Sequence, residues 1–157
     1  MNTEIAFVKL KGIAERSHLE AFLVLSDAWT TPALSQRVDL SSFAEKILQN
    51  GNALMAVTAG NRDIGMAAFY TNDLSGHRAY LTHLVVNPEY RNQGIGKALL
   101  DRAKEYSSSM GMTTMLLEVY SSNGTARRFY ASCGFIETEI KRDNPEATNS
   151  IHMVCSL

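Results

Sequence analysis

The residues that most clearly indicate a binding site lie at positions 85–100. There an apolar stretch is followed by a glycine-bearing turn and then by a helical pattern. Such a turn leaves the first amides of the following helix without backbone acceptors, at the positive end of the helix dipole. That arrangement binds anions, and a pyrophosphate is a natural occupant. Gly94 and Gly96 permit positive φ and let phosphate oxygens approach the main chain without a Cβ in the way. Arg91 is expected to add a charge-assisted contact.

Two other phosphate motifs fit this turn poorly. The nucleoside-triphosphate loop ends in Gly-Lys-Ser/Thr, but here Gly96 and Lys97 are followed by Ala98. The dinucleotide fingerprint needs a third glycine, and Leu99 occupies its place. The plain alternative is that the two glycines only shape a connection between a strand and a helix.

The turn and its surroundings resemble the GCN5-related N-acetyltransferase (GNAT) family. The pyrophosphate motif of that family, Arg/Gln-x-x-Gly-x-Gly/Ala, stands here as Arg91-Asn92-Gln93-Gly94-Ile95-Gly96. It follows a strand that ends Leu84-Val85-Val86 and a turn Asn87-Pro88-Glu89-Tyr90. A second matching set comes later in the family's order: Glu118-Val119, Asn123, Ala126, Phe129-Tyr130 and Cys133-Gly134-Phe135. The resemblance spans residues 81–135 and is nearest to the acetyltransferases of ribosomal proteins and protein N-termini.

The resemblance implies acetyl-CoA as co-substrate and no metal. In the family the sheet opens after its fourth strand, and the pantetheine arm lies in the gap like an added strand, a form of β-strand addition. The backbone expected to pair with the arm belongs to Leu84, Val85 and Val86. The amides expected to hold the pyrophosphate are those of Asn92, Gln93, Gly94, Ile95, Gly96 and Lys97. Asn123 matches a position that contacts the coenzyme near the fifth strand.

Tyr130 matches the family's usual general acid, which protonates the departing thiolate of coenzyme A. A phenol has a reference pKa near 10 and a thiol one near 8.5, so the proton transfer is modest and reversible. The alternative is a structural tyrosine that closes a short apolar helix beside Phe129.

The attacking amine must also lose a proton, because a lysine amine has a reference pKa of about 10.4 and an α-amine one of about 8. Glu118 matches the proposed base of the N-terminal acetyltransferases; the alternative is a carboxylate that only faces solvent. His83 is a second candidate base, or else a structural histidine. Strand alternation puts His83 on one face and Tyr80 and Thr82 on the other, and either set is a candidate for the acceptor side.

The implied activity is that of an acyltransferase that moves an acetyl group to a primary amine by direct attack, with a strand amide near Val85 holding the oxyanion. The acceptor is a peptide α-amine, a lysine or a small amino compound. Trp29 and the turn at residues 30–32 fall in the family's variable acceptor-binding segment, although plain packing is the stronger alternative for Trp29. Two alternatives are a non-catalytic acyl-CoA-binding regulatory module and a toxin that acetylates aminoacyl-tRNA.

The elements that position these residues follow from the apolar periodicity. We expect strands at residues 5–10, 54–59, 64–71, 78–86, 114–119, 135–140 and 151–155. Helices are expected at residues 14–29 with a stripe that includes Leu25, from a cap at Ser42, from Ile95, and at residues 125–132. The order indicates one mixed α/β domain over residues 1–157. With the resemblance, the fold class is a GNAT fold: a largely antiparallel, twisted sheet of about seven strands, splayed between strands four and five, with helices on both faces.

Composition limits the classes of protein that fit. The chain has 157 residues, of which 45% are hydrophobic and 20% charged, as in ordinary soluble domains. No stretch is long and apolar enough for a membrane span, and the first residues lack the pattern of a secretory signal. The net charge of −1, without a basic run, argues against nucleic acid as a partner.

Cys133 and Cys155 have no metal-ligand spacing and are too few for a disulfide framework. We expect reduced core thiols in a cytoplasmic enzyme. Many relatives of this kind dimerise, so a homodimer is a further expectation.

Overall fold

A seven-stranded sheet forms the centre of the computed structural model, which describes residues 4–139 and 149–157. The strands are β1 Ile5–Lys9, β2 Asn52–Thr58, β3 Asp63–Asp73, β4 Arg78–Val86, β5 Thr114–Tyr120, β6 Ile136–Thr138 and β7 Ser150–Ser156. Their order is β1-β2-β3-β4-β5-β7-β6, and every pairing is antiparallel except the parallel one between β4 and β5. The expected fold class is confirmed. The predicted end of the sixth strand, Ile140, lies outside the described residues.

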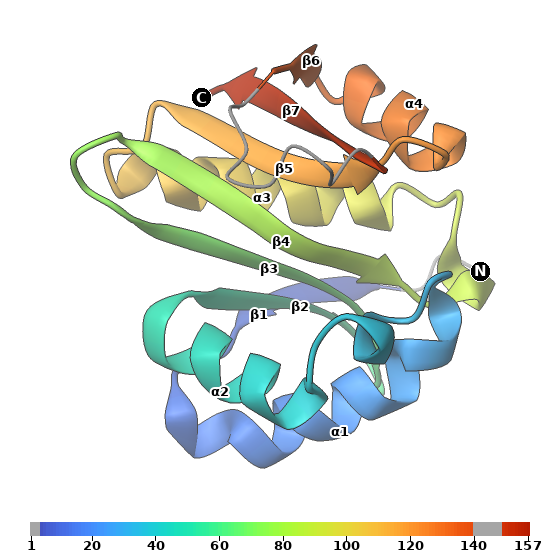
Figure 1. Cartoon of the computed structure of the whole chain (residues 1–157). Coiled ribbons are helices and arrows are strands. Elements are labelled where there is room, and N and C mark those ends of the chain that lie inside the picture. The colour runs from blue at the N-terminus through green and yellow to red at the C-terminus, as the bar shows by residue number, and fades with distance from the viewer. Residues whose placement is uncertain (1–3, 140–148) are drawn as a thin grey trace.

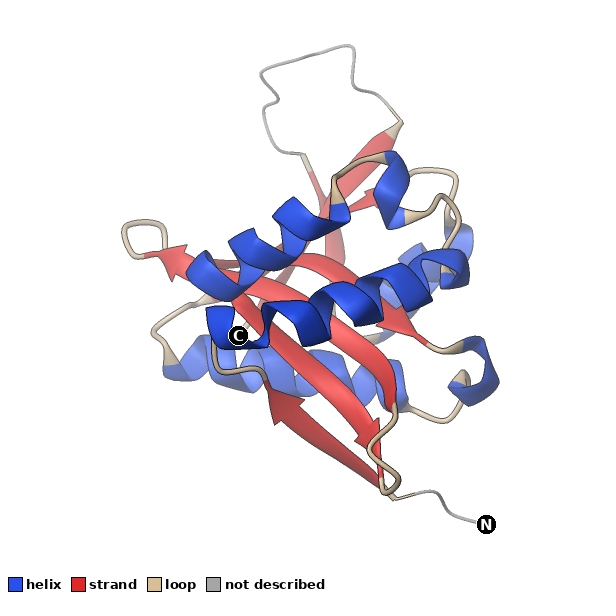
Figure 2. Cartoon of the chain, turned by 90° about the horizontal axis from the view of Figure 1, so that it is seen from below, coloured by secondary structure: helices blue, strands red, loops and turns tan. Residues whose placement is uncertain are grey.

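Helices cover both faces of the sheet (Figure 2). They are α1 Arg16–Ser26, α2 Leu40–Asn50, α3 Ile95–Ser109 and α4 Gly124–Ser132. On one face, α1 and α2 bury apolar residues such as Leu19, Phe22 and Ile47 against the sheet, in one core with Met55 of β2. On the other face, α3 packs through residues such as Leu99, Leu100 and Ala103. The sheet therefore separates two apolar cores, and the functional site must lie at an edge or an opening of it.

The N-terminal helices differ from expectation in two details. Leu25 is 57% exposed, because the buried side of α1 follows Leu19, Phe22, Leu23 and Ser26 and leaves Leu25 on the solvent side. The cap of α2 is Asp39 instead of Ser42. A carboxylate oxygen of Asp39 accepts hydrogen bonds from the Ser42 amide at 2.9 Å and the Ser42 hydroxyl at 2.8 Å. The hydroxyl of Ser42 is thus a donor inside the first turn, not the capping acceptor.

A β-bulge in β4 overturns the predicted alternation of its side chains. Ala68 of β3 pairs with His83 and Phe69 pairs with Leu81, so Thr82 is an extra residue in the ladder. Before the bulge, Leu81 belongs to the core on the α3 face; after it, Leu84 packs on that face and Val85 on the other. His83 consequently lies on the α2 face with Tyr80 and Thr82, and not opposite to them as alternation predicted.

Strands β4 and β5 pair only over their first residues and then diverge (Figure 1). The last parallel pair is Leu81 with Leu117, whereas β5 stays paired with β7 along its whole length. Beyond Leu81, the side of β4 that faces β5 has no neighbouring strand. The main chain of residues 82–86 therefore presents amide and carbonyl groups to an opening in the middle of the sheet.

Candidate active site

The connection from β4 to α3 is shaped to leave amides free at the start of the helix. Asn87 accepts a hydrogen bond from the Glu89 amide at 2.9 Å and starts a short 3-10 turn at Pro88–Tyr90. Gly94 then takes the left-handed conformation (φ 80°) and caps α3 without a side-chain acceptor. The Ala98 amide donates to the Gly94 carbonyl at 3.0 Å, so the three preceding amides have no acceptor within the helix. The result is a cluster of main-chain donors at the positive end of a 15-residue helix.

The two glycines of the turn have different roles. Gly94 uses the positive φ that glycine permits, whereas Gly96 does not, because it already lies in the first turn of α3. A Cβ at Gly96 would stand 3.5 Å from the ring of Phe129 and 3.7 Å from Val86. Gly96 thus lies where α3 passes close to α4 and β4. The other left-handed residue in the turn is Asn92, with φ 62°.

The charged side chains of the turn are held by other groups of the protein. Arg91 donates to the carbonyl of Val86 at 3.2 Å and to that of Trp29 at 2.5 Å, so its guanidinium fastens the connection after α1 to the end of β4. Lys97 forms an ion pair with Asp101 at 2.8 Å. At the predicted anion site the free donors are main-chain amides, and the guanidinium of Arg91 holds two loops together beside them. The predicted contact of Arg91 with a pyrophosphate stays a prediction.

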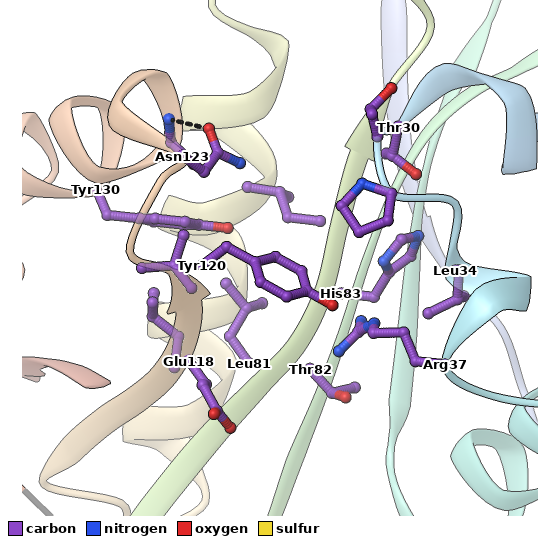
Figure 3. Close-up of a pocket in the computed structure, with 16 residues that line it drawn as sticks. Thr30, Leu34, Arg37, Leu81, Thr82, His83, Glu118, Tyr120, Asn123 and Tyr130 are labelled. Carbon is purple, nitrogen blue, oxygen red and sulfur yellow. Dashed lines mark hydrogen bonds between the residues drawn. The ribbon is translucent and has the colours of Figure 1, made fainter. Parts of the chain in front are cut away.

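The opening between β4 and β5 leads into a cavity of about 170 Å³ (Figure 3). One wall comes from β5 and α4 and includes Glu118, Tyr120, Asn123 and Tyr130. The opposite wall comes from β4 and from the connection between α1 and α2. Its members are Thr30, Thr31, Pro32, Leu34, Arg37, Leu81, Thr82, His83 and Leu84. Three predicted catalytic candidates and the strand predicted to bind the pantetheine arm therefore meet in one place.

Tyr130 points its hydroxyl into this cavity from α4. Its ring packs edge-on against Phe129 at 5.3 Å and Phe135 at 5.7 Å between ring centres, which fixes the direction of the side chain. Within residues 4–139 and 149–157, no group forms a hydrogen bond with the hydroxyl. Burial raises the pKa of the Tyr130 phenol, with a smaller contribution from Cys133. The cavity thus contains a protonated phenol that is free to donate to a ligand.

Asn123 has a structural task at the same wall. Its side-chain oxygen accepts a hydrogen bond from the Ala126 amide at 3.1 Å and caps α4. The cap fixes the start of the helix that carries Tyr130. The predicted contact between Asn123 and the coenzyme stays a prediction, which its place in the cavity lining supports.

Glu118 faces the cavity from β5 with its carboxylate held in place. The hydroxyl of Ser150 donates to one carboxylate oxygen, and the imidazole of His152 lies 3.7 Å from the other. Both partners come from β7, the strand that pairs with β5. The side chain is 42% exposed, so it is in contact with water as well as with the cavity. This geometry suits a base that acts through water.

His83 is half-buried on the other wall, with its ring edge-on to Phe43 at 6.1 Å. Burial lowers the pKa of His83 to about 4, aided by the nearby charge of Arg37 and opposed by that of Asp27. The imidazole is therefore neutral at pH 7 and a weaker base than an ordinary histidine. The lowered pKa removes the advantage that an ordinary histidine has as a base over a carboxylate such as Glu118.

The lowered pKa of His83 predicts a pH-dependent stability. In the unfolded chain the imidazole binds a proton near pH 6.5, whereas in the folded chain it does so only near pH 4, so stability is lost as the pH falls through this window. We expect the free energy of unfolding of His83→Asn to fall less than that of the wild type between pH 7 and 5, by about 2 kcal/mol. Denaturant unfolding at both pH values measures this. His77→Asn, at an exposed turn position, is the control. If the free energy of unfolding falls equally between pH 7 and 5 in the wild type and in His83→Asn, the lowered pKa of His83 is contradicted.

The sequence did not predict the place of Tyr120 and Arg37 in the cavity lining, and one candidate was wrong. Tyr120 lies on β5 two residues after Glu118, so strand alternation was a signal for it. Arg37 lies between two helices, and no pattern in the sequence marked it. Trp29 does not line the cavity: its ring packs edge-on against Phe22 at 5.7 Å, although the turn that follows it does line the wall.

The two cysteines are both free thiols, as expected. Cys155 is buried, but Cys133 is only partly buried, at the end of α4.

No helix of the described chain has the length and apolar character that a membrane span requires. Within the same described residues, no group of three or more histidine, cysteine or acidic side chains is placed to hold a metal ion.

Comparison with known proteins finds N-acetyltransferases among the relatives of this chain. The [ribosomal protein bS18]-alanine N-acetyltransferase of Escherichia coli strain K12 is 38% identical over 78 residues, which cover 50% of this chain and 53% of that enzyme. The chain thus matches about half the length of that relative. The crystal structure of the Escherichia coli ribosomal-protein-S18-alanine N-acetyltransferase superposes with a TM-score of 0.70 at 23% identity, over 98% of this chain and 94% of that one.

A second solved structure has the coenzyme bound. The PaiA N-acetyltransferase of Thermoplasma acidophilum in complex with coenzyme A superposes with a TM-score of 0.73 at 20% identity, over 98% of this chain and 99% of that one. At these identities, the structural matches establish the fold alone. The sequence profile of the Acetyltransferase (GNAT) family matches residues 9–135, which is most of the chain. The chain belongs to the GNAT acetyltransferase family.

Proposed function

We propose that this protein is an N-acetyltransferase that transfers the acetyl group of acetyl-CoA to a primary amine in a ternary complex. The observation that carries the proposal is the coincidence of three features around one opening. They are the unpaired main chain of β4 after Leu81, the free amides at the start of α3, and the unbonded hydroxyl of Tyr130. A thioester laid in the opening would meet all three at once.

The donor fits the opening group by group. A pantetheine arm has two amides, which match the backbone groups on the open side of residues 82–85 as an added strand would, whereas the Val86 carbonyl already accepts a hydrogen bond from Arg91. Its pyrophosphate would then reach the amides of Ile95, Gly96 and Lys97, just beyond the end of β4. This order leaves the thioester at the cavity end of the arm, beside Tyr130 and opposite Arg37.

The amine attacks once it has lost its surplus proton. We assign Glu118 as the base, acting through water because its carboxylate is in contact with both solvent and cavity. The nitrogen lone pair attacks the thioester carbon, and a main-chain amide of β4 near Val85 stabilises the oxyanion. Holding both substrates in one cavity removes the entropic cost of their encounter during the reaction.

The carbon–sulfur bond then breaks, and the thiolate takes a proton from Tyr130. Burial raises the pKa of this phenol, which keeps it protonated at working pH. Burial also raises the pKa of a coenzyme A thiol placed beside Tyr130, so the difference in pKa between the thiol and the phenol stays small. The attacking nitrogen gives up its second proton to water, which leaves a neutral amide, and solvent returns a proton to Tyr130.

The base assignment predicts the effect of Glu118→Gln. Glutamine keeps the acceptor oxygen for Ser150 but cannot take a proton, so we expect kcat/KM to fall about 100-fold or more and the acidic limb of its pH profile to flatten. Steady-state kinetics across pH measure both effects. Glu105→Gln, on the exposed side of α3, loses the same charge and serves as the control. An unchanged acidic limb in Glu118→Gln would remove Glu118 from this role.

The acceptor class is a peptide α-amine, a lysine or a small amino compound. The name of the bS18-alanine relative favours an α-amine, which is easier to deprotonate than a lysine. An acceptor screen with labelled acetyl-CoA and mass spectrometry tests the proposal, with release of free thiol as a second readout. Acetylated amine together with stoichiometric thiol supports it. Coenzyme binding without turnover on any amine would indicate a regulatory module instead, and turnover only on aminoacyl-tRNA would indicate an RNA-directed enzyme.

A further inference from the structure

A guanidinium without an ion-pair partner among the described residues, that of Arg37, lines the cavity opposite Glu118 and Tyr130. We propose that Arg37 binds a carboxylate of the acceptor, so that the preferred substrates are amines that also carry a carboxylate. This inference rests on the proposed function and adds to it the chemical class of the second substrate. Neither the resemblance nor the comparisons point to Arg37.

Arg37 lies at the junction of two cavities. It lines the cavity between β4 and β5, and it also lines a neighbouring one of about 410 Å³ between α2, β3 and β4. Thr82, the extra residue of the bulge, is shared by both as well. Figure 3 shows Arg37 on the wall opposite Glu118 and Tyr130. A molecule that enters from the larger cavity must therefore pass Arg37 to reach the predicted reacting centre.

The carboxylates near Arg37 are committed to other groups. Asp27 accepts hydrogen bonds from the amide and the hydroxyl of Ser35, at 3.0 and 2.5 Å. Asp39 caps α2 through Ser42, and Glu118 is held by Ser150. Among residues 4–139 and 149–157, no carboxylate lies within ion-pair distance of the Arg37 guanidinium. Its five N–H donors stay available for a ligand.

The larger cavity is also rich in donors. Its polar lining includes Lys46, Ser42 and the phenols of Tyr70 and Tyr80. Burial raises the pKa of both phenols, and Glu118 adds to the effect at Tyr80, so both stay protonated. The ammonium of Lys46 lies 5.9 Å from the centre of the Tyr70 ring. The carboxylate of Asp39, which also lines this cavity, already caps α2. The ammonium, the guanidinium and the phenols of the lining therefore complement an anion.

The two walls then match the two ends of a zwitterion. An acceptor with its carboxylate on Arg37 directs its amine across the cavity, toward Glu118 and the opening in the sheet. A guanidinium can bind a carboxylate through two parallel hydrogen bonds, which fixes direction as well as position. The carboxylate has two possible sources: the terminus of a free amino acid, or an acidic side chain next to the N-terminus of a peptide.

Matched acceptor pairs test this inference and separate the two sources. The first pair is L-alanine and L-alaninamide. The second is the peptide amides Ala-Glu-Ala and Ala-Gln-Ala. For at least one pair we expect the wild type to prefer the carboxylate member by about 10-fold or more in kcat/KM. Arg37→Gln is expected to reduce that preference to about 2-fold, whereas Arg37→Lys retains part of it.

Arg102→Gln is the matched control. It removes the same charge on the opposite face of the sheet, where Arg102 stacks on Phe7, and it should keep the wild-type preference. Equal use of both members by the wild type, or an unchanged preference in Arg37→Gln, would overturn the inference while the acetyltransferase activity stands. Coenzyme A titrations on the same preparations report separately on the proposed function: a wild type that binds no coenzyme A contradicts that function and the inference with it.

Discussion

Replacing Gly94 with valine is expected to weaken coenzyme A binding about 100-fold or more, because two effects act at the same residue. Gly94 has φ 80°, a conformation that a β-branched side chain resists. A Cβ at Gly94 would point into open space, with no protein atom within 4 Å, at the place where phosphate oxygens approach the main chain. Calorimetric titration with coenzyme A measures the loss.

Gly111 offers a control for the backbone strain alone. It lies just past the other end of α3, with φ 87°, and a Cβ at this position would likewise have no protein atom within 4 Å. Gly111→Val should therefore lose similar stability but bind coenzyme A like the wild type. If Gly94→Val retains wild-type affinity, the phosphates bind elsewhere on the protein.

Replacing Tyr130 with phenylalanine is expected to lower kcat by about 100-fold or more while the affinity for coenzyme A and the stability stay close to those of the wild type. The ring contacts with Phe129 and Phe135 are preserved in the variant. The lost hydroxyl has no hydrogen-bond partner within the described residues, so its removal leaves no buried group unsatisfied. Steady-state kinetics, calorimetry and thermal unfolding measure the three quantities.

Tyr106→Phe is the matched control for Tyr130→Phe. Tyr106 lies on α3 and packs edge-on against Phe69, away from the cavity, so the loss of its hydroxyl should leave kcat unchanged. A turnover number for Tyr130→Phe within about 3-fold of the wild type would exclude proton donation by the phenol. A large loss of coenzyme affinity would instead indicate that the hydroxyl binds the donor in its ground state.

The main chain of the site was predictable because its signals are local. An apolar strand, a left-handed glycine and a helical stripe are all encoded within residues 78–109, and the structure has them there. The strand and helix order was predictable for the same reason, since each element has its own period. Helix boundaries were harder to predict. Both Asp39 and Ser42 are residue types that cap helices, and the observed cap is Asp39, so α2 begins at Leu40.

The remaining features depend on contacts between distant residues. The bulge at Thr82 arises from the pairing of β3 with β4 and reverses the face on which His83 lies. The hydrogen bond from Arg91 to the carbonyl of Trp29, far away in the sequence, is another contact of this kind. Arg37 reaches the cavity only because the connection from α1 to α2 folds over the end of β4. Sequence periodicity carries no information on such contacts.

The central claim is that the coenzyme occupies the opening between β4 and β5, with its pyrophosphate on the start of α3. Titration of ¹⁵N-labelled protein with coenzyme A, followed by amide NMR, tests it residue by residue. The largest shifts are predicted for the amides of Ile95, Gly96 and Lys97 and for residues 82–86 of β4. The absence of any saturable shift, or shifts confined to residues remote from this opening, would contradict the account.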